Sequence, residues 1–435
     1  MDAIIQSKVT LTQTHLTTEQ KYTTGLLLIG TFLEYFDLML YIHLAILLND
    51  LFFPKTDPHA ASLLAALTFC LTYIFRPVGA LIFGYIGDNV GYKATIIITT
   101  FIMAISCITI ANLPVYDQIG IVSTWIIIIC RIFQGISSVG EIIGAELYLT
   151  EMTKPPIQYP IVALVSVCTI IGGIFALGLA SFSTSFGISW RLAFWAGATI
   201  AIVGTMARTM LKETPKFLRQ KSVVDNSIGP TKFNMTTMLA YFVIQCGWPI
   251  CFYFAYIHCS SILKNSCGYS PEAVIHHNFL LVMLSLVSSL IYAYLSYKIY
   301  PLIILKVRLA IFCIFIVSCP YLLDHYKTPI VIFLIQLMTG LFGICTMPAD
   351  TIFFRHIPIF RRCTYVSLSF ALSRTLIYII ASFGLVYLIE YFGNYGLLVI
   401  MIPITLGFVF GIYHFEKLEK QAGFINPVTI QNLQT

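Results

Sequence analysis

The stretch RPVGALIFGYIGDNVGYK, from Arg76 to Lys93, joins two long apolar segments through a short polar turn. Its small residues allow two helices to approach closely and permit a tight turn, and they are Gly79, Gly84, Gly87 and Gly91. Asp88 supplies an anion that can meet a helix N-terminus or a basic side chain. This stretch therefore predicts two closely packed helices that are joined by a polar turn.

The apolar segments on either side of this stretch have the length of membrane-spanning helices. Crossing about 30 Å of hydrocarbon requires roughly 20 apolar residues in a helix. The whole chain has the same character, because 58% of its 435 residues are hydrophobic and only 10% are charged. Soluble domains contain about 25% charged residues. The composition therefore predicts a membrane-embedded chain and excludes a soluble enzyme core, a disordered chain and a nucleic-acid binder.

Apolar runs bounded by proline, glycine and charge predict an all-α membrane protein with twelve transmembrane helices. The first six are expected near 22–50, 59–85, 93–112, 118–150, 160–182 and 191–210. The second six are expected near 236–258, 273–297, 302–322, 328–352, 363–390 and 395–415. The chain is thus divided into an N-terminal segment (1–21), a six-helix domain (22–210), a linker (211–235), a second six-helix domain (236–415) and a tail (416–435).

Basic residues predict how the chain is oriented in the membrane. The linker is the longest polar stretch within the chain, and it carries Lys212, Lys216, Arg219, Lys221 and Lys232. Most of the 25 Lys and Arg residues fall on the face shared by the linker and both termini, so the positive-inside rule places both termini in the cytoplasm. The first 21 residues lack the pattern of a cleavable signal peptide, and none is predicted.

The twelve cysteines do not indicate a disulfide framework. Most lie inside apolar runs and none forms a C-x-x-C pair, so they are interpreted as small buried apolar residues. Only Cys259 and Cys267 flank a predicted external loop, where a bridge between them is the alternative.

Four charged residues are expected near the middle of predicted helices. A charge at that depth costs about 2.5–3.5 kcal/mol on insertion scales, so each requires a partner or a function. Glu34 and Asp37 share one face of the first helix, with Tyr41 a further turn along. Arg131 lies in the fourth helix and Arg374 in the eleventh. The set is formally neutral, as mutual compensation requires.

The fourth helix carries a polar stripe that is expected to face the bundle interior. Its members recur at steps of three and four residues and are Arg131, Gln134, Ser138 and Glu141. One interpretation is a static pair between Asp37 and Arg131. The favoured interpretation is that Asp37 takes up and releases a proton. Burial raises the proton affinity of a carboxylate and a nearby guanidinium lowers it, so an arginine that moves could switch Asp37 between its two forms. Glu34 fits both interpretations equally, and Glu141 is interpreted as structural.

Several segments resemble a known group of transporters. The stretch from Arg76 to Lys93 resembles the signature loop of the major facilitator superfamily, G-x-x-x-D-x-x-G-R-(R/K), although Asn89 and Tyr92 stand where Arg is usual. EYFDLMLY in the first helix, RIFQGISSVGEIIGAELYLTEM in the fourth and LKETPKF at Leu211–Phe217 are similar to segments of the metabolite:proton symporters. That family includes proline/glycine-betaine, α-ketoglutarate, citrate and shikimate transporters.

The resemblance implies two pseudo-symmetric six-helix halves that rock about a central site. It implies proton-coupled symport of a small organic solute, either a proline- or betaine-like zwitterion or a carboxylate, with Asp37, Glu34 and Arg131 in proton coupling. The expected substrate cavity contains Tyr41, Gln134, Arg374, Gln245 and Tyr256. The expected cytoplasmic gate motif contains Gly84, Asp88, Gly91, Lys93 and Glu141. It further implies a multi-pass monomer in the lipid bilayer of a bacterial inner membrane, without cofactor or metal.

The second half departs from the family pattern and leaves alternatives open. After the eighth helix the chain has Tyr297 in place of the acid of a second signature loop, and before the eleventh Arg355 replaces a Glu. A uniporter, an antiporter or a transporter-derived solute sensor are the rival functions. Many antiporters carry a Gly-Pro-rich motif in the fifth helix, whereas the segment CTIIGGIFALGLA (Cys168–Ala180) has glycines and no proline, which favours symport. No loop presents a nucleophile with a base or a metal-ligand cluster, so an enzyme is not predicted.

Overall fold

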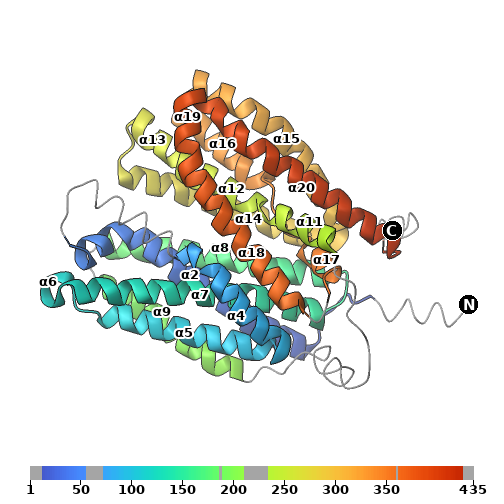
Figure 1. Ribbon diagram of the computed structural model, residues 1–435, viewed down its shortest axis with the longest axis horizontal. Coiled ribbons are helices and arrows are strands. Elements are labelled where there is room, and N and C mark those ends of the chain that lie inside the picture. Colours follow the sequence, from blue (N-terminus) through green and yellow to red (C-terminus); the bar gives the residue numbers. More distant parts are fainter. Residues whose placement is uncertain (1–11, 55–71, 186–188, 210–233, 359–360, 425–435) are drawn as a thin grey trace, which may run out of the picture.

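The computed structural model describes residues 12–54, 72–185, 189–209, 234–358 and 361–424. Within these ranges the chain is almost entirely helical, with one isolated β-bridge between Gln13 and Pro156. Figure 1 shows two groups of helices, one coloured blue to green and the other yellow to red. The predicted linker (211–235) lies almost wholly outside the described residues.

The N-terminal group follows the predicted order of helices. It contains α2 (Thr18–Phe52), α4 (Arg76–Asn89), α5 (Tyr92–Asn112), α6 (Tyr116–Ile119), α7 (Ile121–Met152), α8 (Gln158–Ser185) and α9 (Trp190–Thr209). The first part of the predicted second helix, 59–71, lies outside the described residues. The other predicted bounds of this group differ from the structure by only a few residues.

The C-terminal group is more interrupted than predicted. It contains α11 (Met235–Gln245), α12 (Gly247–Phe252), the π-helix η1 (Tyr253–His258), α13 (Cys259–Cys267), α14 (Pro271–Lys298), α15 (Pro301–His325), α16 (Pro329–Phe342), α17 (Asp350–Arg355), α18 (Arg362–Ile379), the π-helix η3 (Ile380–Gly384), α19 (Leu385–Phe392), the 3₁₀-helix η4 (Gly393–Tyr395) and α20 (Gly396–Gln421).

The protein is a multi-pass membrane protein. Eight helical stretches of the described chain are long and apolar enough to cross a membrane, and two shorter apolar helices accompany them. Large apolar side chains such as Ile314 and Leu406 are exposed on the outside of the bundle. Ionisable side chains such as Asp37 and Arg131 are buried inside it. This arrangement is the one that a hydrocarbon solvent favours.

The predicted continuous helix at 328–352 is wrong in its middle. α16 ends at Phe342, and the chain is not helical again until α17 begins at Asp350. Pro348 cannot donate a backbone hydrogen bond, which disfavours a helix through this segment. The Arg308 guanidinium donates to the carbonyls of Gly343 at 2.7 Å and Met347 at 3.0 Å. A side chain from α15 therefore satisfies carbonyl groups that the interrupted helix leaves unpaired.

The predicted seventh helix is also interrupted, and it is longer than expected. α11 ends at Gln245. In a continuous helix the carbonyl of Gln245 would accept a hydrogen bond from residue 249, but this residue is Pro249, which has no N–H group. The π-helix η1 follows, and α13 then extends the helical run to Cys267. Cys259 and Cys267 therefore lie at the two ends of one helix instead of flanking a loop, and both are free thiols.

The two groups meet along two seams, formed by α4 with α18 and by α8 with α14. Figure 1 shows that the groups lie closest near α4, α17 and α18 and diverge toward α6 and α13. Close packing of the first seam depends on glycine. A Cβ atom on Gly84 would lie 2.5 Å from the Cα atom of Thr364 in α18. The glycine-rich stretch thus determines how closely the two halves approach.

Candidate functional site

Asp37 is the centre of a buried hydrogen-bond network in the N-terminal group. Its side chain is 1% exposed, and its Oδ1 atom accepts a hydrogen bond from Cys107 Sγ at 2.8 Å. Oδ2 accepts from Gln134 Nε2 at 2.5 Å. Arg131 Nη1 in turn donates to Gln134 Oε1 at 2.8 Å. The structure therefore joins Asp37 to Arg131 through Gln134, which we expected in the substrate cavity.

A small cavity in the N-terminal group is lined by two further carboxylates. Its volume is about 10 Å³, enough for about one water molecule. Its lining comprises Gly30, Leu33, Glu34, Thr99, Thr100, Met103, Ser137, Glu141 and Ala201. Glu141 accepts hydrogen bonds from Thr100 Oγ1 at 2.7 Å and from Thr99 Oγ1 at 3.3 Å. Glu34 and Glu141 therefore line the same small cavity inside the N-terminal group.

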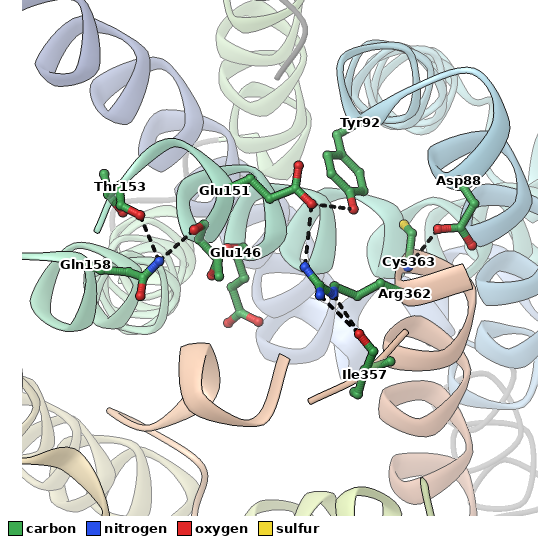
Figure 2. Close-up of polar contacts among 10 residues, drawn as sticks. Asp88, Tyr92, Glu146, Glu151, Thr153, Gln158, Ile357, Arg362 and Cys363 are labelled. Atoms are coloured by element: carbon green, nitrogen blue, oxygen red, sulfur yellow. Dashed lines mark hydrogen bonds and ion pairs between the residues drawn. The ribbon is translucent and has the colours of Figure 1, made fainter. Parts of the chain in front are cut away.

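Asp88, near the C-terminal end of α4, links the two helix groups. Its Oδ1 atom accepts from the backbone N–H of Cys363 at 2.9 Å (Figure 2). Its Oδ2 atom accepts from the backbone N–H of Thr364 at 2.9 Å. Thr364 Oγ1 donates to the same carboxylate at 2.6 Å. The carboxylate thus caps the first turn of α18, where the helix dipole favours negative charge. A motif in one half therefore holds a helix of the other half.

A second acidic residue reinforces this contact, and it is not the predicted Glu141. Glu151, at the end of α7, lies 3.7 Å from Arg362 Nη1 and accepts from the Tyr92 hydroxyl at 3.3 Å (Figure 2). Arg362 also donates to the carbonyl of Ile357. Glu141 precedes Glu151 by ten positions, or about 15 Å along a helix. The acid of α7 at this contact is therefore Glu151, and Glu141 is hydrogen-bonded to Thr99 and Thr100 instead.

The remaining predicted gate residues shape the turn after α4. Gly91 has a φ of 127°, a conformation that glycine adopts readily and that other residues rarely adopt. Lys93 lies in the first turn of α5. The close contact at Gly84 places Asp88, one helical turn further along α4, against α18.

Arg374 lies in a second buried cluster, in the C-terminal group. Its side chain is buried, and Nη1 donates to the Phe370 carbonyl at 3.3 Å and to Gln245 Oε1 at 3.5 Å. Its guanidinium carbon lies 3.3 Å from the ring centroid of Phe370 and 5.2 Å from that of Trp248. Gln245 Nε2 also contacts the Tyr241 hydroxyl at 2.7 Å. The predicted cavity residues Arg374 and Gln245 are therefore neighbours.

The other predicted cavity residues are placed differently. Tyr256 packs its ring against Phe252 at 5.0 Å, and Phe252 in turn contacts Tyr378 at 6.4 Å. An aromatic series thus connects Tyr256 to Tyr378. Tyr41 lies within α2, but its side chain is outside the described part of the structure.

Two acidic residues near Arg374 were missed by the sequence analysis. Glu146 of α7 and Asp350 of α17 are both buried, and each interacts electrostatically with Arg374. They also interact with each other across the two helix groups. Both stand in predicted apolar helices, and that signal could have identified them. They were missed because only charges near the helix centres were considered.

Arg355, which stands where the family pattern has a Glu, is paired with a buried acid. Glu419 near the end of α20 is fully buried, and it lies 3.3 Å from Arg355 Nη1 and 2.6 Å from His356 Nε2. The Tyr300 hydroxyl also donates to Glu419. The departure from the family pattern in the second half therefore has a compensating partner in the last helix.

These features define a class: a multi-pass helical protein whose two helix groups enclose buried ionisable residues and are fastened together at one end. This is the architecture of major facilitator proteins. The structure is similar to that of the proton:xylose symporter XylE bound to 6-bromo-6-deoxy-D-glucose, with a TM-score of 0.74 and 15% sequence identity. The similarity covers 92% of this chain and 96% of that chain.

The chain is similar in sequence to a described family and to several known transport proteins. The family described as "Sugar (and other) transporter" matches residues 23–228. The inner membrane metabolite transport protein YhjE of Escherichia coli (strain K12) is 33% identical over 236 residues, which cover 51% of this chain and 54% of that protein. The proline/betaine transporter of the same organism is 33% identical over 43% of this chain and 39% of its own length. The matches thus span about half of these relatives or less.

Proposed function

We propose that this protein is a secondary active transporter that couples movement of a small organic solute to protons by alternating access. The observation that carries the proposal is the buried network of Asp37, Gln134 and Arg131. A carboxylate inside a membrane domain, joined to a guanidinium through one amide, is a chemical arrangement for taking up and releasing a proton. The names of the relatives, metabolite and proline/betaine transporters, point to the same class of function.

Alternating access requires contacts that hold one end closed and can be broken. The contacts of Asp88 with α18 and of Glu151 with Arg362 suit this role, since both join the two halves. Hydrogen bonds to charged groups contribute about 1.5–3 kcal/mol each. A few such bonds are strong enough to favour one state and weak enough to be exchanged for others. In the proposed cycle these contacts form when the Asp88 end is closed and break when it opens.

The solute is proposed to bind between the two groups, near Arg374. The cationic Arg374 and the acids Glu146 and Asp350 lie together there, at the junction of α7, α17 and α18. A site with both signs of charge suits a zwitterion or a carboxylate. These are the two solute classes that the sequence resemblance implies.

The first prediction is proton-driven accumulation of at least one solute. The purified protein, reconstituted into vesicles with an imposed pH gradient, is expected to concentrate a member of a panel of proline, betaine, α-ketoglutarate, citrate and shikimate. A protonophore should remove the accumulation without stopping equilibration. Equilibration that is indifferent to the protonophore would identify a uniporter. Uptake that requires a counter-solute inside the vesicle would identify an antiporter.

A second prediction concerns orientation, which we propose from the distribution of basic residues. Single cysteines introduced at positions 215–230, in a variant lacking reactive native thiols, should react with an impermeant maleimide only after the cells are permeabilised. A cysteine introduced beside Lys327, on the opposite face by the same argument, serves as the control and should react in intact cells. The reverse pattern of labelling would overturn the proposed topology.

A further inference from the structure

Residues 12–20, which we call the N-terminal strap, are fastened to the connection between α7 and α8. Gln13 forms the isolated β-bridge, in which its N–H donates to the Pro155 carbonyl at 2.8 Å and its carbonyl accepts from the Ile157 N–H at 3.2 Å. The side-chain Oε1 atom of Gln13 accepts from the backbone N–H of Lys154 at 3.2 Å. Backbone and side chain of the strap therefore both bind the segment that follows α7.

Gln20 joins the strap to the last turn of α7. Its Oε1 atom accepts from the Thr17 N–H at 3.0 Å, and its own N–H donates to Thr17 Oγ1 at 3.2 Å. This reciprocal pair is a capping box, and α2 begins at the next residue, Thr18. Gln13 Nε2 donates to the same Oε1 atom at 2.6 Å. With its oxygen held on one side, Gln20 donates through Nε2 to the Met152 carbonyl at 2.7 Å.

The last turn of α7 depends on side chains for its hydrogen bonds. The final carbonyls of a helix have no partner within the helix. Gln158 Nε2 donates to the carbonyls of Thr150 at 2.6 Å and Thr153 at 2.9 Å, and the second of these bonds is drawn in Figure 2. Gln20 supplies the donor for the carbonyl of Met152, which lies between them. Removing the Gln20 donor therefore loosens the end of α7.

Glu151 connects the end of α7 to the other half of the protein. It precedes Met152 in the same turn, and its carboxylate lies 3.7 Å from Arg362 Nη1 in α18. Both side chains of this pair are buried, so water screens their attraction little. The energy of the pair depends on the distance between the two groups. A hydrogen bond that fixes the backbone beside Glu151 therefore also fixes the strength of its pair with Arg362.

We propose that the N-terminal strap holds the Asp88 end of the protein closed by positioning Glu151 against Arg362. Gln13 and Gln20 are positioning residues in this device, because they act through the end of α7. The proposal rests on the proposed alternating access, in which this end opens and closes. Release of the strap weakens the pair between Glu151 and Arg362 and raises the population of the open state.

The native thiol of Cys363 provides the measurement. Cys363 is 1% exposed, its N–H is bonded to Asp88, and a Cβ atom on Gly87 would lie 2.5 Å from its Sγ atom. A maleimide should therefore react with this thiol when α4 and α18 separate, at a rate that follows the open population. The full chain, purified in detergent without solute or pH gradient, is treated with N-ethylmaleimide. Mass spectrometry follows labelling of the peptide that contains Cys363.

Gln20→Glu isolates the strap from the start of α2. A glutamate keeps the capping box with Thr17, but it cannot donate to the Met152 carbonyl. The unfolding temperature should therefore stay near that of the wild type. Loss of this one hydrogen bond should raise the labelling rate of Cys363 about threefold to tenfold. Gln118→Glu makes the same change at an exposed position of α6, and it should be labelled as the wild type is.

A double-variant comparison tests whether the strap acts through Glu151. Glu151→Gln removes the charge that faces Arg362, and it should itself raise the labelling rate of Cys363. Gln20→Glu added to Glu151→Gln should raise the rate no further, because the pair on which the strap acts is already lost. Effects that multiply in the double variant would place the action of Gln20 elsewhere and refute the proposal.

Two other outcomes would contradict the strap. One is a wild-type labelling rate for Gln20→Glu. The other is an equal rise at Cys319, a fully buried thiol in α15, which would indicate general loosening of the protein. Proton-driven uptake together with either result would refute the strap and leave the transport function standing. A rise confined to Cys363, in a protein without proton-driven uptake, would support the strap and count against transport.

Discussion

Asp37→Asn is expected to abolish proton-driven accumulation of the solute while leaving solute exchange intact. Asparagine has nearly the same shape as aspartate and can still accept the hydrogen bond from Cys107, so the packing of α2 should persist. It cannot take up or release a proton in the physiological range. One unit of pH gradient corresponds to about 1.4 kcal/mol, which supports about tenfold accumulation when one proton accompanies each solute. The variant should therefore lose this tenfold excess.

The measurement compares two assays on the same vesicles. Uptake under a pH gradient reports coupling, and exchange of labelled for unlabelled solute at equal pH reports movement of the binding site. Asp117→Asn is the matched control, because it removes an acidic group of the same type from an exposed position on α6. Full accumulation by Asp37→Asn would remove Asp37 from the mechanism. Loss of exchange as well would indicate a structural role in place of proton coupling.

Gly84→Ala is expected to reduce transport about fivefold to 150-fold by disfavouring the state in which the Asp88 end is closed. The new Cβ atom would lie 2.5 Å from the Thr364 Cα atom, and a backbone atom cannot move aside as a flexible side chain can. Overpacking of this kind costs about 1–3 kcal/mol. The cost falls on the state in which α4 and α18 are in contact, so the protein should still fold but populate the opposite state.

The matched control is Gly178→Ala in α8, where an added Cβ atom has no neighbour within 4 Å. This change should leave transport unaltered. Initial uptake rates are compared for the two variants, together with the accessibility of a cysteine placed next to Asp88. That cysteine should become more reactive in Gly84→Ala and remain as it was in Gly178→Ala. Wild-type uptake by Gly84→Ala would show that this close contact does not govern the cycle.

The positions of the helices were largely predictable, but their interruptions were not. Apolar runs identify spans because each span must be apolar along its own length, which is a local property. The break in the predicted tenth helix depends on Arg308, which comes from α15 and satisfies the carbonyls of Gly343 and Met347. No local pattern reports a partner that is supplied by another helix. The same limit applies to Arg355, whose partner Glu419 lies more than sixty positions away.

The buried charges show the same division between local and tertiary information. Asp37, Arg131 and Arg374 were identifiable from the chain because a charge inside an apolar run is visible locally. Their partners were not, and Gln134 proved to stand between Asp37 and Arg131. Glu141 and Glu151 occupy one helix, and only its packing against α5 and α18 decides which of them meets Arg362. Arg76 was quoted as part of a glycine-rich turn, and its burial against Tyr73 became evident only in the structure.

The sequence by itself therefore determined that this protein lies in a membrane, the order of its helices and the presence of ionisable groups inside them. Each of these follows from the composition of a local stretch. Tertiary structure alone decided which groups meet. Asp88 reaches the start of α18 because glycines let α4 and α18 approach closely enough for polar atoms from opposite halves to come into range. That approach is a property of two helices separated by about 270 residues of chain, and hydrogen bonds and charge interactions at this range depend on distance and not on sequence separation.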